Sequence, residues 1–174
     1  MPLTPSSVAW PNAERHAAFE QWLAPLVTAH RLDPATLRAA SADASFRRYL
    51  RIDVAGAANT SCIVMDAPPP QEDVRPFIDV ASRIEAAGLH GPKVLAADAE
   101  RGFLLLSDLG QQLYLQALHD ASAKDADVLM RDAIAALVRW QGYVRVDGLP
   151  TYDHALLHRE LQLFPDWCVE REFA

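Results

Sequence analysis

Residues 43–53 read DASFRRYLRID, and the apolar run TSCIVM follows at residues 60–65. From residue 46 the first stretch alternates as a half-buried strand does. One side of this strand carries Phe46, Arg48, Leu50 and Ile52. The other side carries Arg47, Tyr49 and Arg51. Residues 41–45 have the composition of a turn. The whole stretch is therefore predicted to form a strand, a tight turn and two further strands. Hairpins of this kind commonly cover nucleotide phosphates, although an ordinary β-turn without a ligand also explains Asp43 and Ser45.

The rest of the chain predicts a helix before this hairpin, a helix and two strands after it, and only helices beyond them. The helices show apolar residues at helical spacing, and the strands show alternation or buried runs. The predicted helices cover 12–30, 72–87, 113–119, 124–143, 155–164 and a further piece from about 165, and the predicted strands cover 37–40, 46–53, 60–65, 93–98 and 102–107. Pro25 falls inside the first helix and is expected to kink or divide it.

Hairpin-length connections between the first strands predict an α+β fold with about five strands in a mostly antiparallel sheet. One helix is inserted between the third and fourth strands. The predicted organisation is an irregular N-terminus at 1–11, a first helix and small lobe at 12–106, a linker at 107–111 and a partial helical lobe at 112–174.

Charge and composition narrow the class of partner. The net charge of −7 argues against nucleic acid, and no apolar run approaches the ~20 residues of a membrane span. The first residues lack a basic start and an apolar core, so no secretory signal is expected. A cytoplasmic location is expected instead. Cys62 and Cys168 are expected to be free thiols.

Four blocks of sequence resemble a known family. They are residues 43–49 (DASFRRY), 64–69 (VMDAPP), 105–110 (LLSDLG) and a C-terminal block with YD at 152–153, REL at 159–161 and FPDW at 164–167. Together they are similar to the aminoglycoside phosphotransferase family, whose fold is protein-kinase-like. Within it, they most resemble the bacterial kinases that phosphorylate N-acetylmuramate and N-acetylglucosamine at the anomeric position during cell-wall recycling. The resemblance implies a kinase-like small lobe followed by the first helices of a large lobe.

That resemblance implies transfer of the γ-phosphoryl group of ATP to a sugar hydroxyl with Mg²⁺. Backbone N–H groups of the turn at 43–46 would face the phosphates, although this turn lacks glycine. The backbone of residues 107–109 would pair with the adenine edge. The residues implied in nucleotide binding are Asp43, Ala44, Ser45, Phe46, Arg48, Met65, Ser107, Asp108 and Leu109.

The third strand departs from the usual kinase pattern. Kinases place a Lys there to hold the phosphates, paired with a Glu of the next helix, but this strand offers Met65. Arg48 is a possible substitute, because it falls on the apolar side of its strand; Arg47, Arg48 and Arg51 are otherwise solvated strand residues. Asp66 is expected to have a structural role as a cap of the proline-rich turn, and Glu85 to be a surface carboxylate or a vestigial partner.

The catalytic loop of the family has the form His-x-Asp-x-x-x-x-Asn, and this chain does not contain it. Its only asparagines are Asn12 and Asn59, and the position five before Asn59 is Val54. The sequence therefore predicts an N-terminal fragment with no catalytic residues and no magnesium ligands, inactive alone. A complete member would extend about as far again.

The C-terminal block would contribute to an acceptor pocket through Asp153, Arg159, Glu160 and Trp167. The alternative is a helix with Asp153 as its N-cap and four side chains packed inward, namely Leu156, Leu157, Leu161 and Phe164. The same fold also serves kinases of aminoglycosides, choline or other small alcohols. A non-catalytic module that binds a nucleotide or a protein stays open as well, and exposed apolar faces within 125–170 would favour self-association.

Overall fold

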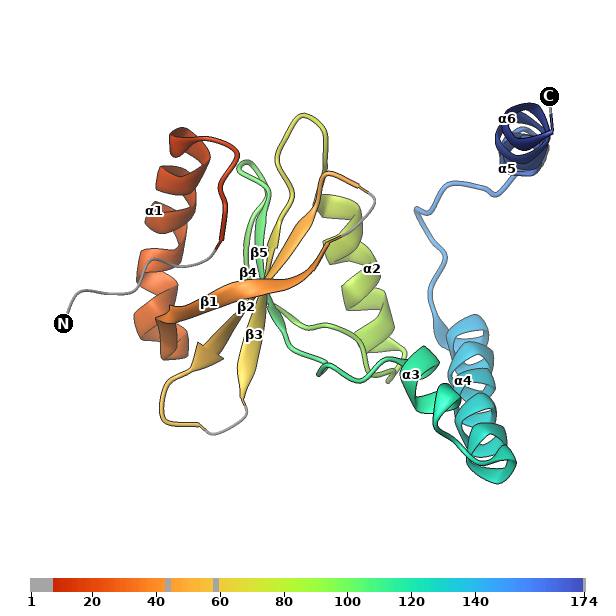
Figure 1. Ribbon diagram of the computed structural model, residues 1–174, viewed down its shortest axis with the longest axis horizontal. Helices are drawn as coiled ribbons and strands as arrows, with labels where there is room; N and C mark the ends of the chain where they lie inside the picture. The colour runs from red at the N-terminus through yellow and green to blue at the C-terminus, as the bar shows by residue number, and fades with distance from the viewer. Residues whose placement is uncertain (1–7, 43–44, 58–59, 174) are drawn as a thin grey trace. The chain divides into compact units, whose positions relative to one another are not determined.

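The computed structural model describes residues 8–42, 45–57 and 60–173 (Figure 1). A five-stranded, wholly antiparallel sheet has the order β1-β2-β3-β5-β4. The elements are α1 (Ala13–His30), β1 (Leu32–Ala42), β2 (Arg48–Val54), β3 (Ser61–Asp66), α2 (Arg75–Ala86), β4 (Val94–Asp98), β5 (Phe103–Ser107), α3 (Tyr114–His119), α4 (Ala123–Tyr143), α5 (His154–Leu163), the π-helical η1 (Phe164–Val169) and α6 (Glu170–Glu172). The predicted α+β fold, with a helix inserted between β3 and β4, is confirmed.

The alternation in β2 sorts its side chains onto two faces of the sheet, as predicted. Leu50 and Ile52 are buried on one face, where they lie opposite Val64 and Cys62 of β3. Tyr49 lies on the other face and packs beside Met65. Because side chains in a strand alternate with a period of two, the parity of a residue number in β2 tells which face it occupies.

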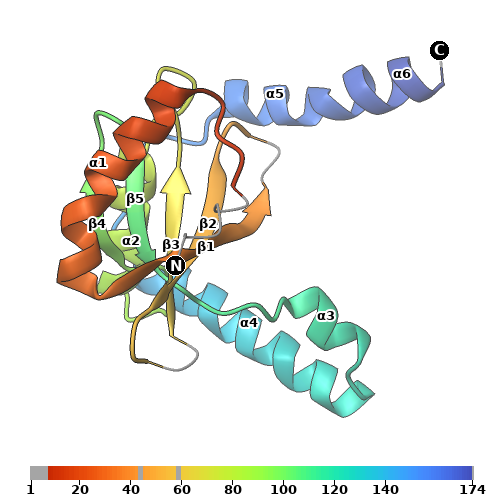
Figure 2. The same cartoon turned by 60° about the vertical axis from the view of Figure 1, so that its left-hand side comes forward.

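Each face of the sheet is covered by one helix (Figures 1 and 2). Phe19, Trp22 and Leu23 of α1 pack on the first face, which we call the α1 face. Phe77 and Ile78 of α2 pack on the second, the α2 face. The sheet therefore carries two separate apolar clusters, and any site on the α2 face is shielded from α1 by the strands.

Strand β1 begins five residues before its predicted start. It pairs with β2 from Leu32 onward, and its register shifts between Asp33 and Arg38 and again between Ala39 and Ser41. Such shifts disturb the alternation that identifies a strand in a sequence, and Pro34 is tolerated because β1 is an edge strand.

Of the two outcomes expected at Pro25, division of the first helix is wrong, because α1 runs unbroken from Ala13 to His30, and a kink stays a prediction. Asn12 starts the helix by accepting a hydrogen bond from the backbone N–H of Arg15 at 2.7 Å. A proline inside a helix costs about 3 kcal/mol, which is comparable to burying one or two large side chains. Phe19 and Trp22, which stack around Phe103, supply that burial.

The helices after β5 leave many apolar side chains exposed. Residues from Arg145 onward form a compact unit of their own. The exposed apolar side chains of α4 and α5 include Val128, Met130, Ile134, Leu137, Val138, Tyr143, Leu157, Leu161 and Leu163. The predicted exposure is confirmed, while self-association stays a prediction. Among the described residues, no helix is both long enough and apolar enough to cross a membrane.

Candidate nucleotide-binding site

A cavity of about 440 Å³ opens on the α2 face, where the sheet meets the segment that follows β5. Its volume falls in the range of small-molecule pockets. Strands β1, β2, β3 and β5, helix α2 and the following segment all contribute to it. The lining residues are Ala40, Ser41, Tyr49, Arg51, Ile63, Phe77, Pro92, Leu106, Ser107, Asp108, Leu109, Gly110, Gln111 and Leu113. The predicted linker thus forms one wall, and Ser107, Asp108 and Leu109 are brought together there.

The floor of the cavity is apolar and rests on a packed cluster. Tyr49, Ile63 and Phe77 are partly buried and pack against Met65 and its neighbours. Apolar and aromatic walls with a few fixed polar groups are typical of pockets that bind a flat heteroaromatic ring.

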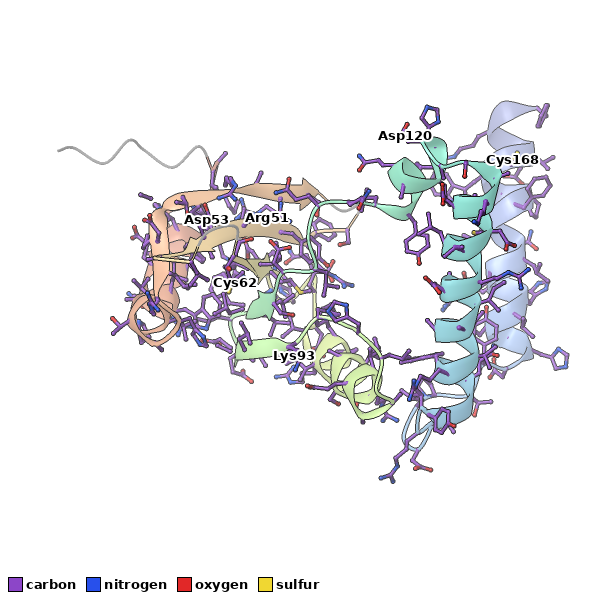
Figure 3. The ribbon with its side chains drawn as sticks, turned by 90° about the horizontal axis from the view of Figure 1, so that it is seen from below. Arg51, Asp53, Cys62, Lys93, Asp120 and Cys168 are labelled. Carbon is purple, nitrogen blue, oxygen red and sulfur yellow. The ribbon has the colours of Figure 1, made fainter. Side chains whose placement is uncertain are left out.

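Asp108 ties the linker to two strands. Its carboxylate accepts hydrogen bonds from Arg51 of β2 (Nε to Oδ2, 2.5 Å) and from the Ser61 hydroxyl of β3 (2.6 Å). It also accepts from the backbone N–H of Gly110 at 2.8 Å, while Arg51 donates to the Gly110 carbonyl at 3.1 Å. We call these four residues the linker clamp; Figure 3 labels Arg51 on β2. The clamp fixes the backbone of the linker against the sheet.

The clamp determines the charge state of Asp108, whose side chain is only 8% exposed. Burial by itself would raise the pKa of this carboxyl group. The hydrogen bonds from Arg51, Ser61 and Gly110, together with the charge of Arg51, outweigh burial and lower the pKa from 3.8 to about 2. A lowered pKa contributes stability that is complete above pH ~4 and is lost as the pH falls toward 2.

The other end of the linker is held by β4. The Lys93 carbonyl accepts from the backbone N–H of Ser107 at 2.9 Å, and the Ser107 hydroxyl accepts from the backbone N–H of Lys93 at 2.8 Å. Gly110 has a φ of +98°, a conformation that favours glycine. Between these ties, the backbone N–H of Leu109 donates to no group within the part of the chain that the structure describes. The linker is therefore tied to the sheet at both ends, yet it retains a backbone donor at the wall of the cavity.

Asp66 lies on the α1 face and has a structural role different from the one expected. It does not cap the proline-rich turn; its carboxylate, 1% exposed, accepts from Arg15 at 2.6 Å and pairs with Arg48. The Arg48 guanidinium also donates to the Ala9 carbonyl and stacks on Trp10. Arg48, considered above as a phosphate ligand, is thus on the face away from the cavity.

The turn before β2 lies only partly within the described residues. Asp43 and Ala44 fall outside them. The Ser45 hydroxyl accepts from the backbone N–H of Arg47 at 3.2 Å, and the backbone N–H of Phe46 donates to Glu72 at 3.1 Å. Met65 is fully buried beneath the cavity floor rather than lining it.

The proposed acceptor residues belong to the unit that starts at Arg145. Asp153 caps α5 by accepting from the backbone N–H of Leu156 at 2.9 Å, as the structural alternative predicted. Arg159 and Glu160 form an exposed pair at 3.3 Å, and Trp167 is exposed with the Arg171 guanidinium over its ring. The other half of that alternative is wrong for three of its four residues, because Leu157, Leu161 and Phe164 are exposed, while Leu156 is half-buried.

Two further sequence expectations concern charged and metal-binding side chains. Glu85 is a surface carboxylate, paired with Lys93 at 3.2 Å. Across the described residues, no group of three or more His, Cys, Asp and Glu side chains is arranged to hold a metal ion. The Mg²⁺ that the resemblance implies therefore has no fitting ligand set there.

Sequence reasoning missed Arg51 and Ser61 as parts of the site. The signal for Arg51 was its position next to Leu50 in an alternating strand, which places its cation on the face opposite to that of Leu50. Nothing local in the sequence linked it to Asp108, 57 residues away.

Comparison with known proteins agrees with this geometry. The model of the phosphotransferase enzyme family matches residues 36–173, and the chain belongs to that family. The chain is 54% identical over 138 residues to an N-acetylmuramate/N-acetylglucosamine kinase of Pseudomonas aeruginosa, covering 79% of this chain and 39% of that protein. Kinases with the same name from Pseudomonas putida and Neisseria meningitidis are 51% and 35% identical, over 79% and 91% of this chain and 39% and 46% of theirs. The chain thus spans about two fifths of the length of its Pseudomonas relatives.

Proposed function

We propose that this chain forms the ATP-binding lobe of a cytoplasmic sugar kinase. In the whole protein, the γ-phosphoryl group of ATP would pass to the anomeric hydroxyl of N-acetylmuramate or N-acetylglucosamine. The observation that carries the proposal is the cavity between the sheet and a clamped linker, found in a member of the phosphotransferase enzyme family. The names of three relatives support the choice of acceptor.

The described residues suggest how the nucleotide would be held. The adenine ring would lie over Tyr49 and Ile63, with its edge toward the backbone of Ser107 and Leu109. We propose residues 107–111 as the hinge between the nucleotide-binding lobe at 12–106 and the helices that begin at 112. Because the clamp orders the linker before the nucleotide arrives, less conformational entropy is lost on binding. The proposal assigns Mg²⁺ no ligand among the described residues.

A chimera tests the activity. The matching 138 residues of this chain replace the corresponding segment of the P. aeruginosa kinase, and the purified chimera is incubated with ATP, Mg²⁺ and N-acetylmuramate. We expect a sugar 1-phosphate, detected by phosphorus NMR, formed within about tenfold of the relative's rate, or ~1.4 kcal/mol in activation free energy. N-acetylglucosamine is tested in parallel, with an aminoglycoside and choline as control acceptors.

The 174-residue chain alone is expected to form no product, because it contains no His-x-Asp-x-x-x-x-Asn sequence. A chimera that melts cooperatively but phosphorylates neither amino sugar would contradict the proposal. So would measurable turnover by the 174-residue chain.

A further inference from the structure

Three arginines, one just before β2 and two within it, differ in how their guanidinium groups are used. Arg48 donates to Asp66 through both Nε and a terminal nitrogen, and Arg51 binds Asp108 in the same manner. Arg47 instead donates through Nε to Glu72 Oε2 at 2.9 Å. Arg47 therefore holds its carboxylate partner through Nε, and not through the edge of the guanidinium that its two terminal nitrogens form.

Arg47 lies on the same face as the cavity. The register of β2 and β3 pairs Arg48 with Asp66 on the α1 face and Tyr49 with Met65 on the α2 face. Arg47 immediately precedes this ladder, so the alternation places it on the face of Tyr49. Its hydrogen bond with Glu72 raises the pKa of Arg47 against the opposing effect of burial, and a smaller contribution comes from Tyr49, which lines the cavity.

Glu72 holds Arg47 beside the turn that precedes β2. Its side chain is 10% exposed, and it accepts both from Arg47 and from the backbone N–H of Phe46 at 3.1 Å. The Arg47 side chain is 34% exposed, which leaves it accessible to a ligand. Arg47 lies four residues along the strand from Arg51 of the clamp, or roughly 13 Å at 3.3 Å per residue. This separation suits a nucleotide whose base lies at the linker and whose phosphates extend toward the turn.

We propose that Arg47, oriented by Glu72, binds the phosphate groups of the nucleotide and supplies the positive charge that Met65 does not. This inference rests on the proposed function of the cavity. A planar guanidinium can hold a phosphate through two parallel hydrogen bonds, which an ammonium group cannot do. The carboxylate of Glu72 keeps the guanidinium in place, as a glutamate does for the third-strand lysine of other kinases.

The test compares a ligand that has phosphates with one that lacks them. The 174-residue chain is titrated with ATP and with adenosine, as the parent chain and as the Arg47→Met variant. We expect Arg47→Met to weaken ATP binding about tenfold or more and to leave adenosine binding unchanged, since only charge-assisted hydrogen bonds to phosphate are lost. Arg47→Lys keeps the charge and should lose less. Arg38→Met is the matched control, because it removes one positive charge from an exposed pair with Asp53.

Each other outcome decides against the proposal. Unchanged ATP affinity in Arg47→Met would refute the role of Arg47 and leave the nucleotide site standing. Equal weakening of ATP and adenosine would show that Arg47 only supports the fold. A parent chain that binds neither ligand would refute both this inference and the proposed function.

Discussion

We expect the replacement of Asp66 with Ala to lower the free energy of unfolding by about 3 kcal/mol, because it leaves the guanidinium groups of Arg15 and Arg48 without their shared counterion. Arg15 is 12% exposed and stacks over Phe103, so water reaches its charge poorly. The substitution also unties α1 from β2 and β3, which Asp66 connects. Urea unfolding of the 174-residue chain measures the change.

The matched control for Asp66→Ala is Asp53→Ala. Asp53 also pairs with an arginine, but both side chains of that pair are 42% exposed, and such pairs contribute less than about 1 kcal/mol. If Asp66→Ala costs no more than this control, the buried network does not stabilise the fold as described. Because Asp66 lies on the α1 face, the folded fraction of Asp66→Ala should bind nucleotide with the affinity of the parent.

Asp108→Ala has the second large effect, and it acts on both stability and binding. It leaves Arg51 buried without its carboxylate and should cost about 2 kcal/mol or more in unfolding free energy. It also releases the linker from the sheet, so nucleotide binding must then be accompanied by a loss of conformational entropy at residues 107–110. We expect the dissociation constant for ATP to rise about tenfold, or ~1.4 kcal/mol. Titration calorimetry measures the dissociation constant for ATP in Asp108→Ala, with Asp53→Ala as the control variant.

Acid separates the contribution of the Asp108 charge from that of packing. The pKa of Asp108 is lowered to about 2, so the parent chain loses this contribution on acidification, and Asp108→Ala has none of it to lose. The difference in unfolding free energy between the two chains should therefore shrink by about 1 kcal/mol between about pH 6 and pH 3. A difference that stays constant across this range would contradict the charge-based account of the clamp.

The sequence predicted the order of the elements because each one follows local rules. The alternation from Arg48 to Ile52 identified β2 and both of its faces. Gly88, which has a positive φ, lies just after the end of α2 and terminates this helix near the predicted position. The linker was predicted from its position directly after β5, and its five residues, 107–111, all line the cavity.

Long-range partners could not be predicted in the same way. The alternation placed Arg48 correctly on the apolar side, but only the fold shows that Asp66 and Arg15 occupy that side with it. The neighbouring Arg47 looked like a solvated residue, because Glu72 comes from a loop 25 positions later. The continuity of α1 through Pro25 likewise depends on packing of the helix against Phe103, which lies on a strand distant in the sequence.

The most direct measurement is amide chemical-shift mapping of the isotope-labelled 174-residue chain during titration with ATP. A nucleotide bound between the sheet and the linker should shift the amides of Leu106, Ser107, Leu109 and Tyr49 most strongly, and should leave those near Asp66 on the α1 face nearly unchanged. Absence of any saturable shift, or shifts confined to residues 153–167, would contradict the account.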